Sequence, residues 1–176
     1  MRPINGAARD QLLARCQREA LHLETRDSYA LGTEGERFAR FLATGTRDHE
    51  AEAGERRHWT ELIRRLTESG RRVRRARVVS EPISDYIRFE WAGTQVIVDA
   101  GEQVRWLPRR LASTLLLPGN NFWLFDAGTV VFSLFDGAGE VVDRRLSTDG
   151  AIVQRCLTAF EAVWQVAIPH NDYRPR

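Results

Sequence analysis

The sequence contains no lysine, so all 26 of its basic side chains are arginines. Lysine supplies the phosphate-binding cation of a P-loop and the amine of Schiff-base and pyridoxal-phosphate enzymes, so these classes are excluded. Protein kinases and Ser-Lys hydrolases need an active-site lysine and are excluded for the same reason. A GC-rich genome alone can raise the arginine content, so the abundance by itself says little about function.

Cysteine and histidine are scarce, and long apolar runs are missing. The two cysteines, Cys16 and Cys156, lie far apart, and the four histidines form no His-x-x-x-His pattern, so we expect free thiols, no metal site and no cofactor. No apolar run reaches the roughly 18 residues of a membrane span, and the first residues contain no apolar signal segment. The sequence therefore predicts a cytoplasmic protein without membrane contact.

The spacing of apolar residues predicts helices in the first part of the chain and mostly strands later. Helices are expected over residues 7–23, 33–43 (with Thr33 as N-cap), 55–69, from Ser84 onward, and 150–167, with residues 46–55 as a linker. Strands are expected over residues 73–79, 103–107, 122–126, 129–136 and 140–146, with a hairpin turn at residues 127–128. Residues 94–98 are compatible with a helix and with a strand.

This order indicates the α+β class, in the form of an α/β sandwich whose mixed sheet of about five strands is covered by helices. A chain of 176 residues is long enough to bury a core without disulfides or metals. We expect an N-terminal helical segment, residues 1–50, packed on an α/β domain, residues 51–176.

Charge is concentrated in residues 56–77, which hold nine arginines against only Glu61 and Glu68. Clustered arginines bind phosphate through paired N–H donors and give a salt-dependent affinity for nucleic acid. The alternative is a solvated helix face, because both glutamates stand four residues from an arginine. The candidate nucleic-acid residues are Arg64, Arg65, Arg71, Arg72, Arg74 and Arg75. No aromatic residue lies within residues 60–85 to provide a stacking platform for single strands.

The remaining candidates form a hypothetical site for a small anionic ligand rather than a catalytic set. Asp85 and Glu90 are five residues apart, which does not place a general acid and base on one helix face, so we expect no catalytic residues. The hypothetical ligand-binding residues are Arg88, Arg105, Asn121 and Asp126. A simpler interpretation of Asp126 is that its side chain caps the turn it enters, and Arg105 suits an ion pair or a cation–π contact inside the fold.

Several segments together resemble an actinobacterial family of unknown function, as found in Streptomyces. The resemblance covers residues 10–173 and is carried by RVVSEPISDYIRFEW, AGEQVRWLPR, LPGNNFWLFD and FEAVWQVAIPHNDY. Genes of that family often neighbour helix-turn-helix regulators, so the resemblance implies a regulatory role and such a regulator as partner.

The C-terminal half is also distantly similar to phospholipase-D-like domains. Those phosphodiesterases carry a His-x-Lys-x-x-x-x-Asp motif, in which histidine is the nucleophile or acid and lysine holds the phosphate. With Asp126 at the Asp position, Gly119 stands at the histidine position and Asn121 at the lysine position. Neither residue can replace a nucleophile or a cation, so the resemblance implies a degenerate domain without that chemistry.

Three hypotheses follow from the sequence. The first is a non-enzymatic regulatory or accessory protein that binds a helix-turn-helix regulator or a small anionic ligand. The alternative is a nucleic-acid-binding protein that uses residues 56–77, and the second alternative is an enzyme of unrecognised type. The sequence leaves a homodimer open.

Overall fold

A computed structural model describes all 176 residues apart from the side chain of Glu55. The strands are β1 (Arg2–Pro3), β2 (Glu19–Glu24), β3 (Arg72–Val79), β4 (Gln103–Pro108), β5 (Asn121–Phe125), β6 (Thr129–Phe135), β7 (Val141–Ser147) and β8 (Ile168–Pro169). The helices are α1 (Gly6–Arg15), α2 (Gly35–Thr44), α3 (His49–Glu68), α4 (Asp85–Asp99) and α5 (Gly150–Val166), with short 3-10 turns η1 (Gly32–Glu34) and η2 (Arg109–Ala112).

The strands form one eight-stranded mixed sheet in the order β1-β7-β6-β5-β2-β3-β4-β8. The β2–β3 and β3–β4 pairs are parallel, and the other pairs are antiparallel. The predicted α+β class with a helix-covered sheet is confirmed, but the prediction of about five strands is wrong. The three additional strands are β1 and β8, which are too short to show a periodicity, and β2, which the sequence assigns to a helix.

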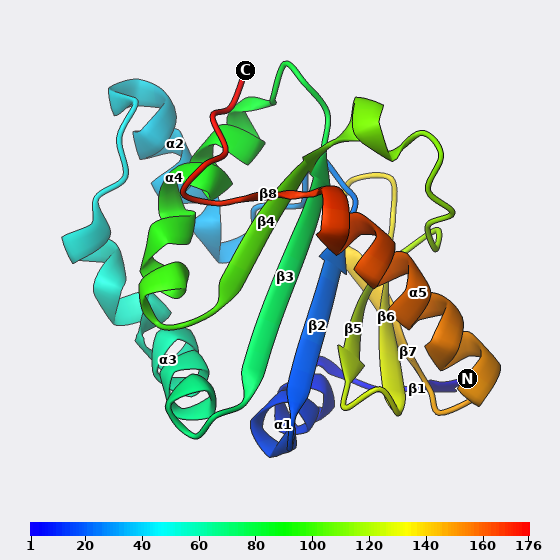
Figure 1. Cartoon of the computed structure of the whole chain (residues 1–176). Coiled ribbons are helices and arrows are strands. Elements are labelled where there is room, and N and C mark those ends of the chain that lie inside the picture. The colour runs from blue at the N-terminus through cyan, green and yellow to red at the C-terminus, as the bar shows by residue number, and fades with distance from the viewer.

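The two faces of the sheet are covered by different helices (Figure 1). On one face, α5 packs against apolar side chains of the central strands, among them Leu23, Val78 and Leu124. On the opposite face, α1 and α3 cover one cluster and α4 covers another. Because side chains alternate along a strand, neighbouring residues of β3 point into different environments. Arg74 faces α5, and Arg75 faces the other side.

The predicted helix over residues 7–23 is wrong beyond Arg15, where α1 ends. The next residues turn back and enter the sheet as β2, so residues 1–50 supply two strands as well as helices. A remote carboxylate holds this turn, because Asp126 accepts hydrogen bonds from three successive backbone N–H groups, those of Gln17, Arg18 and Glu19. The side chain of Asp126 therefore ties the β5–β6 turn to another segment, whereas the sequence suggests that it caps its own turn.

The remaining helices differ from the predictions mainly at their ends. Residues 94–98, which the sequence leaves open, belong to α4, and Ser84 caps that helix as predicted by accepting from the Ile87 N–H. Helix α3 begins at His49 with Asp48 as its cap, so residues 49–55 of the predicted linker 46–55 are helical and the linker prediction is wrong for most of its length. Helix α2 begins at Gly35, and Thr33 lies in η1 rather than at the cap position.

The Asp126 contact generates a stability prediction. Asn keeps the left-handed backbone of this position, where φ is 52°, since it adopts that region more readily than most residues. Asp126→Asn should therefore replace a charged hydrogen-bond acceptor by a neutral one without changing the turn. We expect the free energy of unfolding at pH 7, measured by chemical denaturation, to fall by about 1–3 kcal/mol. Asp172→Asn, at an exposed carboxylate without such contacts, is the matched control and should change stability by less than about 0.5 kcal/mol.

The same contact predicts a pH dependence. Burial raises the pKa of Asp126, but the backbone N–H groups of Gln17, Glu19 and Arg18 outweigh it and hold the pKa below its usual 3.8. A depressed carboxyl pKa gives stability that is present above the unfolded pKa and is lost as the pH falls through the folded pKa. The difference between wild type and Asp126→Asn should shrink below about pH 4. A difference that stays constant between pH 7 and pH 2 would contradict this role.

Candidate functional site

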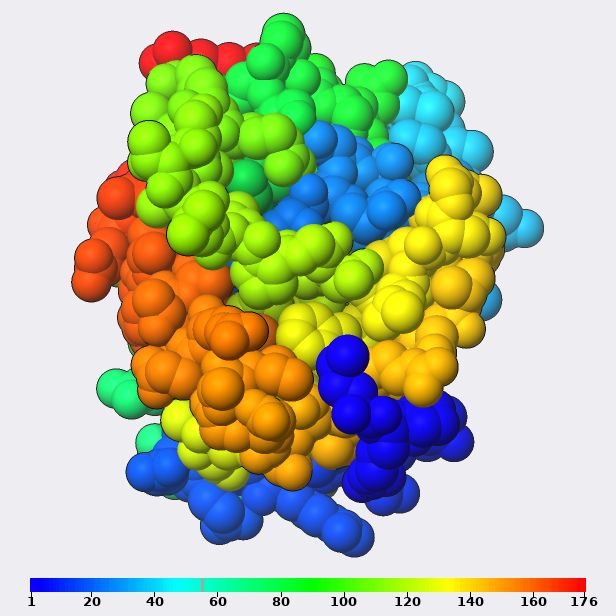
Figure 2. Space-filling model, turned by 90° about the vertical axis from the view of Figure 1, so that its right-hand side faces the viewer, coloured from blue at the N-terminus to red at the C-terminus, as the bar shows by residue number. Residues whose placement is uncertain are grey.

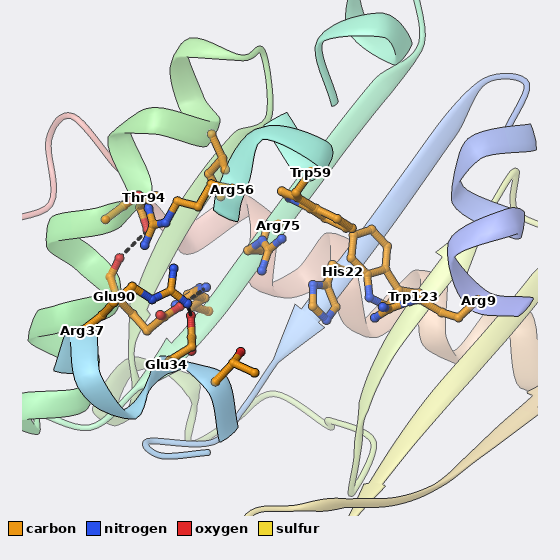
Figure 3. Close-up of a pocket in the computed structure, with 14 residues that line it drawn as sticks. Arg9, His22, Glu34, Arg37, Arg56, Trp59, Arg75, Glu90, Thr94 and Trp123 are labelled. Atoms are coloured by element: carbon orange, nitrogen blue, oxygen red, sulfur yellow. Dashed lines mark hydrogen bonds and ion pairs between the residues drawn. The ribbon is translucent and has the colours of Figure 1, made fainter. Parts of the chain in front are cut away.

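A cavity of about 800 Å³ opens over the centre of the sheet, on the face opposite α5. Three strands supply its floor, and α1, η1, α2, α3 and α4 supply its walls (Figure 3). The lining residues are Arg9, His22, Thr33, Glu34, Arg37, Arg56, Trp59, Arg75, Arg77, Glu90, Gly93, Thr94, Ile97 and Trp123. Five of these side chains are arginines and only two are carboxylates, so the cavity surface is predominantly cationic.

The floor consists of polar side chains that strand alternation places on one face. Arg75 and Arg77 stand two residues apart on β3, and both are buried, with 8% and 5% of their surface exposed. Arg75 contacts Glu24 and Glu102 at 2.7 Å each, and Arg77 contacts Glu24 at 3.0 Å and Glu90 at 2.8 Å. Glu24 therefore joins the two arginines, which fixes both guanidinium groups in place.

Two of these carboxylates lie behind the arginines. Glu24 and Glu102 are buried and do not line the cavity, whereas both arginines do. Burial by itself lowers the pKa of Arg75, but Glu102 and Glu24 outweigh it and the pKa is raised. The pKa of Arg77 is raised in the same way, by Glu24 and Glu90 against burial. Both guanidinium groups stay charged, and among the described residues neither Arg75 Nη2 nor Arg77 Nη1 has a hydrogen-bond or ion-pair partner.

His22 lies beside the two arginines on β2. Its ring stacks on Trp123, with ring centroids 4.1 Å apart and an interplanar angle of 16°. Its Nδ1 lies 3.2 Å from Glu24 Oε1, close enough for an electrostatic contact although the alignment is poor for a hydrogen bond. Burial, followed by the charge of Arg75, holds the pKa of His22 well below 6.5, so the ring is neutral at physiological pH.

The wall formed by α3 and α4 contains a second buried ion-pair group. Arg47 binds the carboxylate of Glu52 and donates to the backbone oxygen of Phe89, and Arg56 donates to the backbone oxygen of Gly93. Glu52 also contacts Arg56 at 3.3 Å. Gly93 has no side chain to obstruct these arginines: a Cβ there would lie 2.7 Å from Arg56 Nη2 and 2.8 Å from Arg47 Nη1.

The rim beside α2 carries the carboxylates of the cavity. Glu34 contacts Arg37 at 3.1 Å, and both side chains point toward the cavity (Figure 3). Burial, followed by the neighbouring charge of Glu90, raises the pKa of Glu34. Each of the two carboxylates is paired with an arginine, Glu34 with Arg37 and Glu90 with Arg77.

The four hypothetical ligand-binding residues lie in different places. Arg88 is exposed on α4, 3.9 Å from Asp85. Arg105 lies on the α5 side of the sheet, donates to the Trp164 oxygen and stacks over that ring at 4.5 Å, as the sequence suggests. Asn121 and Asp126 stand at opposite ends of β5. The structure does not bring these four side chains together around one cavity.

The six arginines of the nucleic-acid alternative are also divided. Arg64 and Arg65 are exposed on α3, and Arg72 is exposed at the start of β3. Arg74 faces α5, where it contacts Glu19 and Glu161, and only Arg75 lines the central cavity. The basic segment is therefore continuous in sequence but not on the surface.

Sequence reasoning missed most of the cavity because its residues come from distant segments. Arg9, His22, Trp59 and Trp123 belong to four different elements, and the two tryptophans meet edge to face at 6.0 Å. The sequence does contain one signal of the cavity. Arg75 and Arg77 alternate with Ala76 and Val78 in a strand, so both arginines lie on one covered face, where buried charges need carboxylates as partners.

A second cavity, of about 840 Å³, lies between the loop of residues 113–118 and α5. Figure 2 looks onto this side of the molecule, where the yellow-green loop lies beside the orange helix. Its lining is mainly apolar, and Leu116 is 95% exposed at its edge. Among the residues that the structure describes, no cluster of His, Cys, Asp or Glu could hold a metal ion, and no helix is long and apolar enough to cross a membrane.

Comparisons with known proteins identify the family and the fold. The profile of a family described as a domain of unknown function, DUF6879, matches residues 7–175. Among curated proteins, none matches the chain. Two solved structures are similar: Nuc from Salmonella typhimurium, a phospholipase D family member, with a TM-score of 0.53, 12% identity and coverage of 95% of this chain and 91% of that chain; and NucT from Helicobacter pylori, with a TM-score of 0.52, 10% identity and coverage of 93% and 91%.

At these identities the likeness establishes a shared fold. It contradicts the hypothesis of a non-enzymatic regulatory or accessory protein, because the fold is that of a family named for an enzyme. The phospholipase-D-like resemblance is confirmed for the fold. Asn121, at the lysine position, binds the Thr25 N–H and the Tyr29 hydroxyl instead.

The tight packing at Gly93 predicts that alanine substitutions at two helical glycines, Gly93 and Gly54, change stability in opposite directions. Gly93→Ala should displace Arg47 and Arg56 from their backbone acceptors and lower the free energy of unfolding by about 1–2 kcal/mol, although alanine is the better helix former. Gly54→Ala, on α3, meets nothing within 4 Å, so it should raise stability by up to about 1 kcal/mol. Chemical denaturation of both variants measures the difference. An equal stabilisation by both substitutions would show that the arginines do not need the space at Gly93.

Proposed function

Since the chain belongs to the DUF6879 family and shares its fold with phospholipase D family members, we propose that it binds a phosphate group of single-stranded nucleic acid in the central cavity. The observation that carries the proposal is the pair of buried arginines, Arg75 and Arg77. Both line the cavity, and both contact the buried carboxylate of Glu24, which does not line it; Glu102 adds a second contact to Arg75 and Glu90 a second contact to Arg77.

The arrangement suits phosphate because it combines charge with fixed geometry. Guanidinium groups bind phosphate oxygens through directed N–H donors, and donors that are already positioned lose little entropy on binding. Arg9 and Arg56 add cationic groups from α1 and α3 at the rim. A phosphate that enters the cavity would meet arginines from at least three elements.

The depth of the cavity favours a single strand over a duplex. The polar groups of the floor are almost fully buried beneath four helices, whereas a duplex presents its phosphates on a wide, rigid surface. A flexible strand can place one phosphate inside, and Trp59 on the α3 wall offers aromatic surface of the kind that stacks with bases.

The proposal is tested with a fluorescein-labelled single-stranded 12-nucleotide DNA, whose anisotropy is measured at two salt concentrations. Wild type should bind, with an affinity that falls as salt rises. The double variant Arg9→Gln/Arg56→Gln removes two rim cations and should weaken binding by at least tenfold, since one charge-assisted hydrogen bond contributes about 1.5–3 kcal/mol. Unlabelled mononucleotide and inorganic phosphate should compete.

The matched control is Arg64→Gln/Arg65→Gln, which removes two arginines from the exposed face of α3, outside this cavity. It should change the affinity by less than about threefold at 150 mM salt, where exposed charges are largely screened. Thermal unfolding of each variant checks the fold. A larger loss in the control than in the cavity variant would move the site to the exposed face of α3, and either that result or no binding by wild type would overturn the proposal.

A further inference from the structure

We infer that His22 is a catalytic general base that activates water against a phosphate ester bound in the central cavity. This inference rests on the proposed function, since it needs a phosphate group beside Arg75 and Arg77. It does not involve the positions of the phospholipase-D-like motif, because Gly119 and Asn121 occupy them and His22 stands on a different strand.

The orientation of the ring is set by two neighbours. The indole of Trp123 stacks against one face and limits rotation. The carboxylate of Glu24 lies 3.2 Å from Nδ1 and favours the tautomer with the proton on that nitrogen. The lone pair then belongs to Nε2, which bonds to no residue in the described part of the chain. A ring held by stacking, with a carboxylate beside one nitrogen and no bonded partner at the other, is an arrangement in which histidine can act as a general base.

A neutral histidine contributes no positive charge, so anion binding alone does not explain its place in the cavity. The groups around His22 are Arg9 from α1, Glu24 on its own strand, and Arg75 and Arg77 from β3. The three arginines supply donors, whereas Nε2 can only accept a hydrogen bond. An acceptor among cations repels phosphate oxygens but binds the hydrogen of a water molecule. The site therefore offers a place for phosphate on Arg75 and Arg77 and a place for water on His22.

The reaction balances with water as the only co-reactant. His22 Nε2 takes a proton from water while the water oxygen forms a bond to phosphorus. The bond between phosphorus and the leaving oxygen breaks, and the proton on Nε2 passes to that oxygen. A phosphodiester and water thus give a phosphomonoester and an alcohol, and His22 returns to its neutral state. The charges of Arg75 and Arg77 stabilise the negative charge that develops on the phosphate oxygens.

The test compares hydrolysis and binding in the same variants. Wild type is incubated with bis(4-nitrophenyl) phosphate and with the labelled 12-nucleotide DNA, and both should be hydrolysed. His22→Asn should reduce the rate at least 100-fold, in line with the usual contribution of a general base, while its DNA affinity changes by less than about threefold. His58→Asn, at an exposed position on α3, is the matched control and should leave both unchanged.

Two further measurements separate a catalytic from a structural role. Imidazole added to His22→Ala should restore part of the rate, which it would not do if the ring only supported the fold. Because the pKa of His22 is lowered by burial and by Arg75, the wild-type rate should persist below pH 6.5 and fall only at more acidic pH, where the ring becomes protonated. His22→Gln provides a second variant if the asparagine variant unfolds.

The outcomes distinguish this inference from the proposed function. If wild type binds DNA but hydrolyses neither probe, or if His22→Asn hydrolyses both at the wild-type rate, the inference is wrong and the binding proposal stands. If wild type binds nothing, both are wrong. Phosphate attached to His22 in protein quenched during turnover would also overturn the general-base role, because it would show direct attack by the histidine.

Discussion

One buried carboxylate organises the centre of this molecule. Glu24 contacts Arg75, Arg77 and His22, so it links β2 to β3 on the face that the helices cover. Charged groups in such a place are stable only as a complete set, because removing one partner leaves an uncompensated buried charge that costs about 3–5 kcal/mol. The helices that cover this face of the sheet must therefore carry polar side chains as well as apolar ones, because buried charges need polar partners. Arg9, Arg56 and Glu90 are such polar side chains, and all three line the central cavity.

The same constraint connects stability with the candidate function. Glu24 and Glu102 hold the guanidinium group of Arg75, and Glu24 and Glu90 hold that of Arg77, so both groups are positioned by contacts within the protein. Preorganised donors of this kind bind phosphate without a large entropic loss and stabilise developing charge without reorganisation. Under the proposed function the ion-pair network both supports the fold and binds the ligand, so substitutions in its middle should affect both stability and affinity.

The sequence predicted most elements that have a periodic pattern of their own, including the β5–β6 hairpin, β4 and α5. It failed where a long-range contact decides the local structure. Residues 16–23 continue an apolar helical pattern, yet Asp126, more than 100 residues away, binds the backbone there and directs the chain into β2. The candidate site was missed for a related reason. The sequence suggests one basic surface over residues 56–77, but alternation on β3 places Arg74 on one face and Arg75 on the other. Only the sheet order shows that His22 and Trp123 lie near Arg75.

The fold alone does not locate the chemistry. Asn121, Trp123 and Phe125 alternate along one face of β5, so the lysine position of the phospholipase-D-like motif shares a face with the central cavity. Tyr29 and Thr25 cover that end of the strand by binding Asn121, which closes it to a ligand. The open space lies two residues further along, where Trp123 pairs with His22 across the β2–β5 ladder. A related fold can therefore present a polar cavity on the same sheet face with different residues. What such a cavity binds depends on the side chains that line it, and here these include arginines held by buried carboxylates beside one neutral histidine.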